Sequence, residues 1–213
     1  MILPLSLMLE LVRSCAPGVA AETMLALSHA ESRFDSLAIG VNDGPPAPGP
    51  FRTPDAAVKA ARRLISEGRS VDLGLGQINN RNLSWLGLSI EDAFDPCLNL
   101  KASARVLKEA YSSASPGRAG SQDRLHEALS RYNTGHPIRG LRNGYVGRVV
   151  ASSRLLAPAL PAPKQISHRH LAEDNLSGRT GGEAVDVFAR PGSRTLLVFG
   201  PAARIGSPQE KDQ

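Results

Sequence analysis

Apolar residues recur at helical spacing along most of residues 1–156, and this periodicity limits the fold more than any other feature. The pairs Thr53-Pro54 and Asp95-Pro96 are typical of a helix N-terminus, because the first residue caps free amides and proline suits the first turn. We predict a helix opened by Pro17 and four later helices. Their inward positions are Ala57, Val58, Ala61, Leu64 and Ile65; Cys97, Leu100, Ala104, Leu107 and Tyr111; Leu125, Ala128, Leu129 and Tyr132; and Tyr145, Val149, Val150 and Ser153. The sequence therefore predicts a mainly α fold.

A carboxyl group ends the apolar stripe of the first predicted helix. The stripe consists of Ala20, Met24, Leu27 and Glu31, whose spacing places them on one helix face. Burial disfavours the charged form of a carboxyl group, and glycosidases use such a group, with a pKa raised to about 6, as a proton donor. Alternatively, Glu31 turns outward and hydrogen-bonds Ser32 or Arg33, and the stripe alone favours this alternative.

A glycine-bracketed segment, GLGQIN at residues 74–79, offers amide groups beside an apolar residue. Its two glycines allow positive φ or a close approach of the backbone to a ligand. We expect Gln77 and Asn79 to point outward and Ile78 to point inward. Such a surface suits a neutral substrate rich in hydroxyl and amide groups, such as an N-acetylated sugar. The segment lacks the third glycine of a dinucleotide fingerprint and the Lys-Ser or Lys-Thr of a nucleoside triphosphate loop.

Four ordered motifs resemble those of the lysozyme-like lytic transglycosylases: HAESRF at residues 29–34, DLGLGQIN at 72–79, ALSRYNTG at 128–135 and GYVGRV at 144–149. The strings CAP at 15–17, LAIGVN at 37–42 and AFDPCLNL at 93–100 are similar to the transglycosylase subunit of type IV secretion and conjugation systems. The resemblance covers about residues 13–155. It implies the lysozyme-like catalytic fold shared by goose-type lysozyme and the soluble lytic transglycosylases.

The resemblance also implies roles for particular residues. Glu31 matches the family's single catalytic acid. Expected to bind or face the substrate are Ser32, Gln77, Asn79, Tyr132, Asn133 and Tyr145, of which the two tyrosines also fit simple core packing. Many members have Met in place of Gly76 and some have Ser in place of Gly40. We expect the first change to loosen one wall of the sugar site and the second to remove a partner of the substrate's acetamido group.

The implied activity is that of a peptidoglycan lytic transglycosylase acting on the MurNAc–GlcNAc β-1,4 bond. Most glycosidases use two carboxylates; here the substrate's own N-acetyl group replaces the second one. Glu31 protonates the leaving oxygen and then deprotonates the 6-hydroxyl group, which gives 1,6-anhydro-MurNAc. The resemblance implies local opening of the cell wall for a type IV secretion or conjugation apparatus.

Two other functions fit the same residues. One is a muramidase that hydrolyses this bond, with Asp72 holding a water molecule opposite Glu31. Asp72 more readily braces the turn before Gly74, as aspartate often does. The other is a glycan-binding assembly factor whose chemistry is dispensable. No cofactor or metal is expected, since the histidines show no metal-ligand spacing.

Composition changes near residue 157. We expect residues 1–156 to form the catalytic domain and residues 157–213 a Pro/Ala-rich linker and disordered tail. Apolar clusters at 185–188 and 196–199 fit strand addition to a secretion-channel subunit, or weak hydrophobic islands without a partner. Further loops are expected at residues 44–50 and 113–121.

The two cysteines, the N-terminal residues and the net charge give information on the cellular compartment and the binding partners of the protein. The resemblance favours a disulfide between Cys15 and Cys97, with two buried thiols as the alternative. Residues 1–12 are apolar but contain Glu10, lack a leading basic residue and are too short for a membrane span. Either the sequence starts inside a longer one, or these residues serve as a poor export signal, or export takes another path. A periplasmic location is inferred from the substrate alone. The net charge of +5 comes from scattered basic residues, so no nucleic-acid partner is expected.

Overall fold

The structure of the protein, a computed structural model, describes residues 1–114 and 121–160. Its longer helices are α1 (Leu5–Cys15), α2 (Ala21–Ser32), α3 (Pro54–Ser66), α5 (Pro96–Ser112), α6 (Ser121–Thr134) and α8 (Tyr145–Leu156). Two short helices are α4 (Leu83–Leu86) and α7 (Arg139–Arg142), and the strands are β1 (Ile39–Val41), β2 (Val71–Leu73) and β3 (Ile78–Asn79). The mainly α class is confirmed. The predicted tail lies, from residue 161 onward, outside the described residues.

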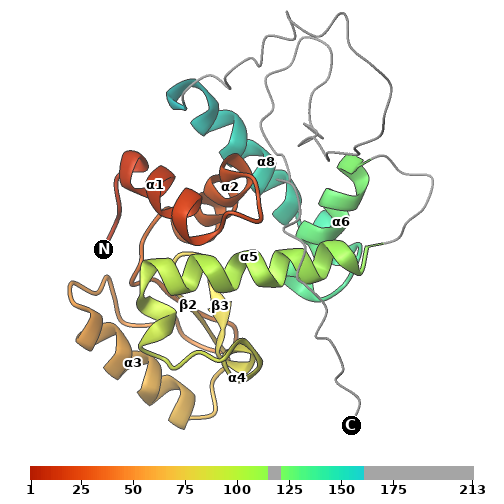
Figure 1. The fold of residues 1–213 in the computed structure, drawn as a ribbon. Coiled ribbons are helices and arrows are strands. Elements are labelled where there is room, and N and C mark those ends of the chain that lie inside the picture. Colours follow the sequence, from red (N-terminus) through yellow and green to blue (C-terminus); the bar gives the residue numbers. More distant parts are fainter. Residues whose placement is uncertain (115–120, 161–213) are drawn as a thin grey trace, which may run out of the picture.

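Helix α5 runs through the middle of the molecule, with α1, α2 and α8 on one side and α3 and the strands on the other (Figure 1). It contributes residues to two hydrophobic clusters. On one side, Leu100 and Leu107 are fully buried among α1, α2, α6 and α8. On the other side, Ala102 packs with α3 and the sheet, where Val71 and Leu73 are fully buried. Both halves of the molecule are therefore built on the same helix.

Helix starts follow the predicted capping signals. The Thr53 hydroxyl accepts a hydrogen bond from the Ala56 amide at 3.3 Å, and the Asp95 carboxylate accepts one from the Leu98 amide at 2.8 Å. Pro17, in contrast, does not open a helix, because α2 begins at Ala21 and Pro17 lies in the preceding turn. The prediction for that helix start was wrong by four residues.

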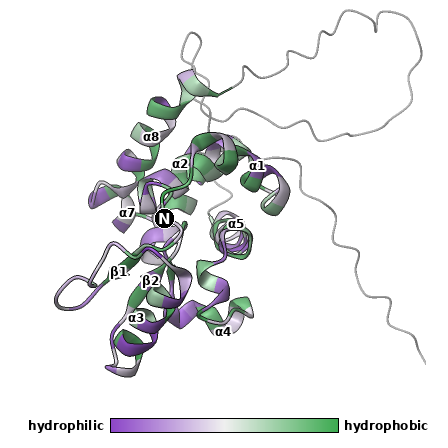
Figure 2. Cartoon of the chain, turned by 90° about the vertical axis from the view of Figure 1, so that its left-hand side faces the viewer, coloured by the Kyte–Doolittle hydropathy of each residue, from purple (hydrophilic) through white to green (hydrophobic). Residues whose placement is uncertain are grey.

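The N-terminal segment is part of the folded domain. Residues 5–15 form α1, in which Met8 and Val12 are fully buried, and Figure 2 shows this helix as mostly hydrophobic, in contrast to α3. The Leu3 amide also bonds to the Phe34 carbonyl at 2.9 Å. Reading residues 1–12 as a poor export signal thus missed their place in the core. Within residues 1–114 and 121–160, none of the helices combines the length and apolar composition needed to cross a membrane.

Two connections tie these parts together. A disulfide joins Cys15, the last residue of α1, to Cys97 in the first turn of α5. The three strands form an antiparallel sheet in the order β1-β2-β3, with Ile39 opposite Leu73 and Asp72 opposite Asn79. The sheet was not predicted, because strands of two or three residues carry too little periodicity. It brings residues 39–41 beside the glycine-bracketed segment.

Candidate active site

Glu31 lies in the last turn of α2, where the helix stops abruptly. Arg33 and Phe34 both adopt positive φ, at 53° and 67°, and so end the helix two residues later. Met24 and Leu27 on the same stripe are fully buried, and Glu31 itself is half-buried. The Glu31 carboxylate accepts a hydrogen bond from the Tyr145 hydroxyl at 2.5 Å. Glu31 therefore points inward. The outward alternative, in which it pairs with Ser32 or Arg33 and which the stripe alone favoured, is wrong.

Burial makes Glu31 a proton donor near neutral pH. Loss of solvent raises its pKa from an ordinary 4.5 to about 7, and the nearby negative charge of Asp72 adds to this rise. The hydrogen bond from Tyr145 and the positive charge of Arg148 act in the opposite direction. Burial and the neighbouring Glu31 also raise the pKa values of Tyr132 and Tyr145, so both phenols remain neutral donors. Near pH 7, Glu31 thus exists in both protonation states.

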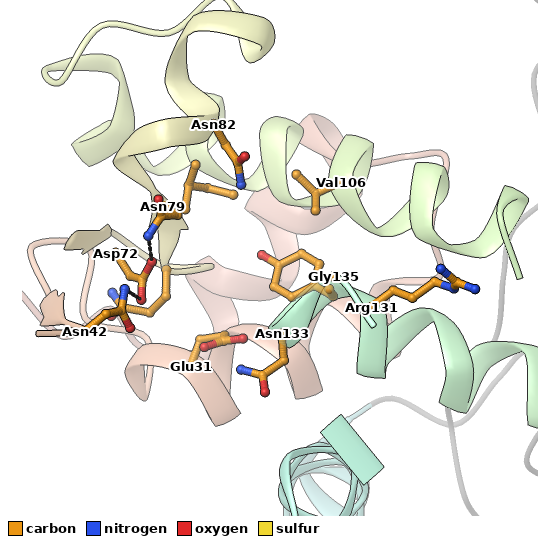
Figure 3. Close-up of a pocket in the computed structure, with 12 residues that line it drawn as sticks. Glu31, Asn42, Asp72, Asn79, Asn82, Val106, Arg131, Asn133 and Gly135 are labelled. Atoms are coloured by element: carbon orange, nitrogen blue, oxygen red, sulfur yellow. Dashed lines mark hydrogen bonds between the residues drawn. The ribbon is translucent and has the colours of Figure 1, made fainter. Parts of the chain in front are cut away.

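A cleft of about 380 Å³ opens in front of Glu31. Its lining is rich in amides and is drawn in Figure 3: Glu31, Asn42, Asp72, Gln77, Ile78, Asn79, Asn82, Val106, Arg131, Tyr132, Asn133 and Gly135. Glu31 faces Asn133 on one wall, whereas Asp72, Asn42 and Asn79 gather on another. The cleft therefore offers two carboxyl groups, one arginine and many uncharged hydrogen-bonding groups, which suits a sugar.

The glycine-bracketed segment needs both of its glycines. Gly74 has φ +71°, and a Cβ there would lie 2.3 Å from the Ala93 carbonyl oxygen. A Cβ on Gly76 would lie 2.0 Å from the Ser103 hydroxyl. The buried Asn99 holds the turn, since its side chain accepts from the Gly76 amide at 2.8 Å and donates to the Leu73 and Ala93 carbonyls.

Two predicted site residues connect this segment to the helices around it. The Ser32 hydroxyl donates to the Leu75 carbonyl at 2.8 Å, and the Tyr132 hydroxyl donates to the Gly76 carbonyl at 2.7 Å. The expectation that Gly76 loosens a wall of the site is not met, because Ser103 and Tyr132 fill the space beside it. Gly40 likewise faces a side chain, since a Cβ there would lie 2.7 Å from Gln77 Oε1.

Asp72 lies on β2 in the same cleft as Glu31. Its two oxygens accept hydrogen bonds from Asn79 at 2.7 Å and from Asn42 at 2.9 Å. Burial raises its pKa, and these two bonds act against the rise. Asp72 thus braces two cleft amides across the sheet, and neither bond goes to the turn before Gly74.

The structure gathers most of the predicted residues. Gln77, Asn79, Tyr132 and Asn133 line the cleft with Glu31, and Ile78 points inward at 2% exposure. Ser32 and Tyr145 do not line it; Tyr145 bonds to the lining residue Glu31, and Ser32 bonds to Leu75 in the glycine-bracketed segment. Within the described ranges, no group of three or more His, Cys, Asp or Glu side chains is placed to hold a metal ion.

Sequence reasoning missed several lining residues, including Asn42, Asn82 and Arg131, as well as the supporting Asn99. Asn99 carried one usable signal, because it is a polar residue between the buried positions of α5. Asn42 ends the LAIGVN string, which was read only as part of the resemblance.

Comparison with known proteins adds independent information. A family model described as "Transglycosylase SLT domain" matches residues 8–147. "Protein virB1" of Rhizobium radiobacter is 39% identical over 166 residues, which cover 78% of this chain and 69% of that protein. "Protein virB1" of Agrobacterium fabrum (strain C58) is 37% identical over 150 residues, 70% of this chain and 60% of that protein. "Type IV secretion system protein virB1" of Brucella abortus (strain 2308) is 37% identical over 153 residues, 68% of this chain and 63% of that protein. No solved structure gives a significant match.

Proposed function

The chain belongs to the transglycosylase SLT domain family, and from this premise we propose that it is a peptidoglycan lytic transglycosylase. It cleaves the MurNAc–GlcNAc β-1,4 bond and leaves a 1,6-anhydro-MurNAc end. The observation that carries the proposal is the Glu31 carboxyl group, whose pKa of about 7 places a single proton donor on a cleft lined by amides.

The reaction needs one proton donor that later becomes a base. Protonated Glu31 gives its proton to the glycosidic oxygen as the bond from that oxygen to the MurNAc anomeric carbon breaks. The carbonyl oxygen of the MurNAc N-acetyl group attacks the anomeric carbon from the other side. Ionised Glu31 then takes the proton of the 6-hydroxyl group, and O6 displaces the acetamido oxygen. Glu31 is protonated again, and no water is consumed.

The surrounding groups suit this sequence. Tyr145 holds one Glu31 oxygen by a 2.5 Å hydrogen bond, which leaves the other oxygen to carry the transferred proton. The Asn133 amide nitrogen and the Gln77 amide oxygen are available to hydroxyl and acetamido groups. The side-chain nitrogens of Gln77 and Asn79 instead donate within the protein, which holds these two residues in place.

Digestion of purified murein sacculi tests the proposal. Wild type is expected to release muropeptides with 1,6-anhydro ends, detected by mass spectrometry, and Glu31→Gln should lower the rate about 10³-fold. Glu22→Gln, at the start of the same helix, is the matched control and should keep full activity. Equal digestion by wild type and Glu31→Gln would reject Glu31 as the proton donor.

A second candidate is hydrolysis of the same bond, and Asp72 is the observation that favours it. Its carboxylate lies in the cleft with Glu31, as a second carboxylate does in many glycosidases. Against this role, both Asp72 oxygens are engaged by Asn79 and Asn42. Reducing-end products from wild type that disappear in Asp72→Asn would establish hydrolysis, whereas anhydro products from both proteins would exclude it.

The setting of the activity is part of the same proposal. Relatives named as type IV secretion system proteins support a role in opening the wall for such an apparatus, which would place the enzyme in the periplasm. The disulfide fits an oxidising compartment. Recruitment of channel subunits by residues 157–213 is a further proposal. Comparing apparatus assembly in cells with Glu31→Gln and cells with the tail deleted separates the enzyme from a glycan-binding assembly factor.

A further inference from the structure

One exposed aromatic ring lies beyond the end of the cleft. Trp85 is the single tryptophan of the chain, and it is 44% exposed on α4. We infer that Trp85, together with Asn82 and Arg105, forms a distal sugar-binding subsite that receives a further aminosugar of the glycan strand. The inference rests on the proposed function and extends it, because it assigns recognition of strand length to residues away from the reacting bond.

The contacts of the ring place it in line with the cleft. The Trp85 indole N–H donates to Asn82 Oδ1 at 3.2 Å, and Asn82 lines the cleft. The Arg105 guanidinium lies 4.8 Å from the ring centroid, and the next residue of α5, Val106, also lines the cleft. Figure 3 shows Asn82 and Val106 at the same end of the cleft, away from Glu31. A glycan that leaves the cleft between these two residues therefore meets the Trp85 ring.

The ring is held in place before any ligand arrives. Leu83 anchors α4 in the cluster around the sheet, and Gly87 ends the helix with φ +71°. The Leu88 amide then bonds back to the Leu83 carbonyl at 3.0 Å. Single exposed apolar residues are common and need no explanation by themselves. Here the ring edge is bound by a cleft residue and one face by a guanidinium, so little ordering remains to be done on binding.

The available groups match an aminosugar. The apolar face of a pyranose ring packs on an aromatic ring, whose rim is polar at the indole nitrogen. The Asn82 amide nitrogen has no acceptor among residues 1–114 and 121–160, and Figure 3 shows it turned toward the cleft interior. It can donate to a hydroxyl or acetamido oxygen, and the exposed Arg105 guanidinium supplies further donors.

The single tryptophan makes the test direct. The full chain carrying Glu31→Gln is titrated with a hexasaccharide of N-acetylglucosamine, with binding followed by calorimetry and indole emission recorded in parallel. Binding is expected to shift the emission. Adding Trp85→Ala should weaken binding about tenfold, and Trp85→Phe should weaken it less. Leu155→Ala, which removes an exposed apolar side chain of α8, is the control and should not alter the affinity.

Calorimetry and indole emission together distinguish failure of the distal subsite from failure of the proposed function. Calorimetric binding with unchanged emission and unchanged affinity of Trp85→Ala would overturn the distal subsite and leave the proposed function intact. Absence of any binding by the Glu31→Gln protein, checked for native circular dichroism, would count against the proposed saccharide cleft and against the subsite with it.

Discussion

The Tyr145 hydroxyl donates a 2.5 Å hydrogen bond to the Glu31 carboxylate, although 114 positions separate the two residues in the chain. Tyr145 is the first residue of α8, and its side chain is 1% exposed. The bond therefore fixes the acid through a buried residue that does not itself line the cleft. It also lowers a pKa that burial alone would raise further.

Tyr145→Phe should alter the pH dependence of activity. Without the hydroxyl, only the charge of Arg148 still opposes the effect of burial on Glu31, whose pKa then rises above about 7. Activity needs the protonated acid, so the alkaline fall of kcat/KM should move to higher pH, and kcat should drop about tenfold through loss of orientation. Tyr111→Phe removes a hydroxyl on α5 and serves as control. A wild-type pH profile in Tyr145→Phe would refute the role of this bond.

Glu31 should make the fold less stable as pH rises. Between the ordinary pKa of 4.5 and the folded value of about 7, the folded state holds a proton that the unfolded state has lost. The contribution of Glu31 to the free energy of unfolding is complete below the lower pKa and is lost as pH rises through this window. For the whole shift the loss is about 3 kcal/mol. Urea unfolding of wild type and Glu31→Gln on either side of the window measures this. The variant should have a flatter profile and exceed wild type on the alkaline side, and parallel profiles would contradict the prediction.

The disulfide should contribute strongly to stability. Cys15 and Cys97 close a loop with a sequence separation of 82. The bond lowers the conformational entropy of the unfolded chain and thereby raises the free energy of unfolding by about 4 kcal/mol. Replacing both residues with Ser should lower the free energy of unfolding by that order. Adding a reducing agent should affect wild type in the same way and the double variant not at all. Equal stability of oxidised wild type and variant would show that the link adds nothing.

Gly76→Ala should destabilise the protein by about 2 kcal/mol, because the added Cβ would lie 2.0 Å from the Ser103 hydroxyl. It should also reduce activity, since the Tyr132 hydrogen bond to the Gly76 carbonyl would be disturbed. Gly147→Ala is the matched control. Nothing lies within 4 Å of a Cβ at this position of α8, and alanine there should stabilise by about 0.5 kcal/mol. Thermal unfolding that moves both variants in the same direction would contradict the argument.

Local signals in the sequence predicted the helices well and the supporting contacts poorly. Thr53 and Asp95 predict where α3 and α5 begin, because capping depends only on neighbouring residues. Helix α1 was missed, since its N-cap is Pro4 and no side chain caps it. The strands were missed because they are too short for a pattern and exist only through pairing.

The residues of the site likewise fall into some that local sequence signals predicted and others that they did not. Helical spacing puts Glu31 in line with the buried Met24 and Leu27, although the stripe alone favoured an outward side chain. The alternation in residues 77–79 predicts their orientation. The positions of Asn42 and Asn82 in the cleft depend instead on how loops fold back onto the sheet. The resemblance assigned Tyr145 to the cleft, but its hydrogen bond to the acid was predicted neither by the resemblance nor by spacing.

The sharing of α5 by both hydrophobic clusters has a mechanical consequence. If the two halves of the molecule closed around a polymer by a hinge motion, they would have to bend α5, a continuous helix of 17 residues. Such a helix is far stiffer than a loop hinge. The width of the cleft is therefore fixed by the folded structure. A glycan strand has to enter a rigid cleft, either lengthwise from one end or from the side.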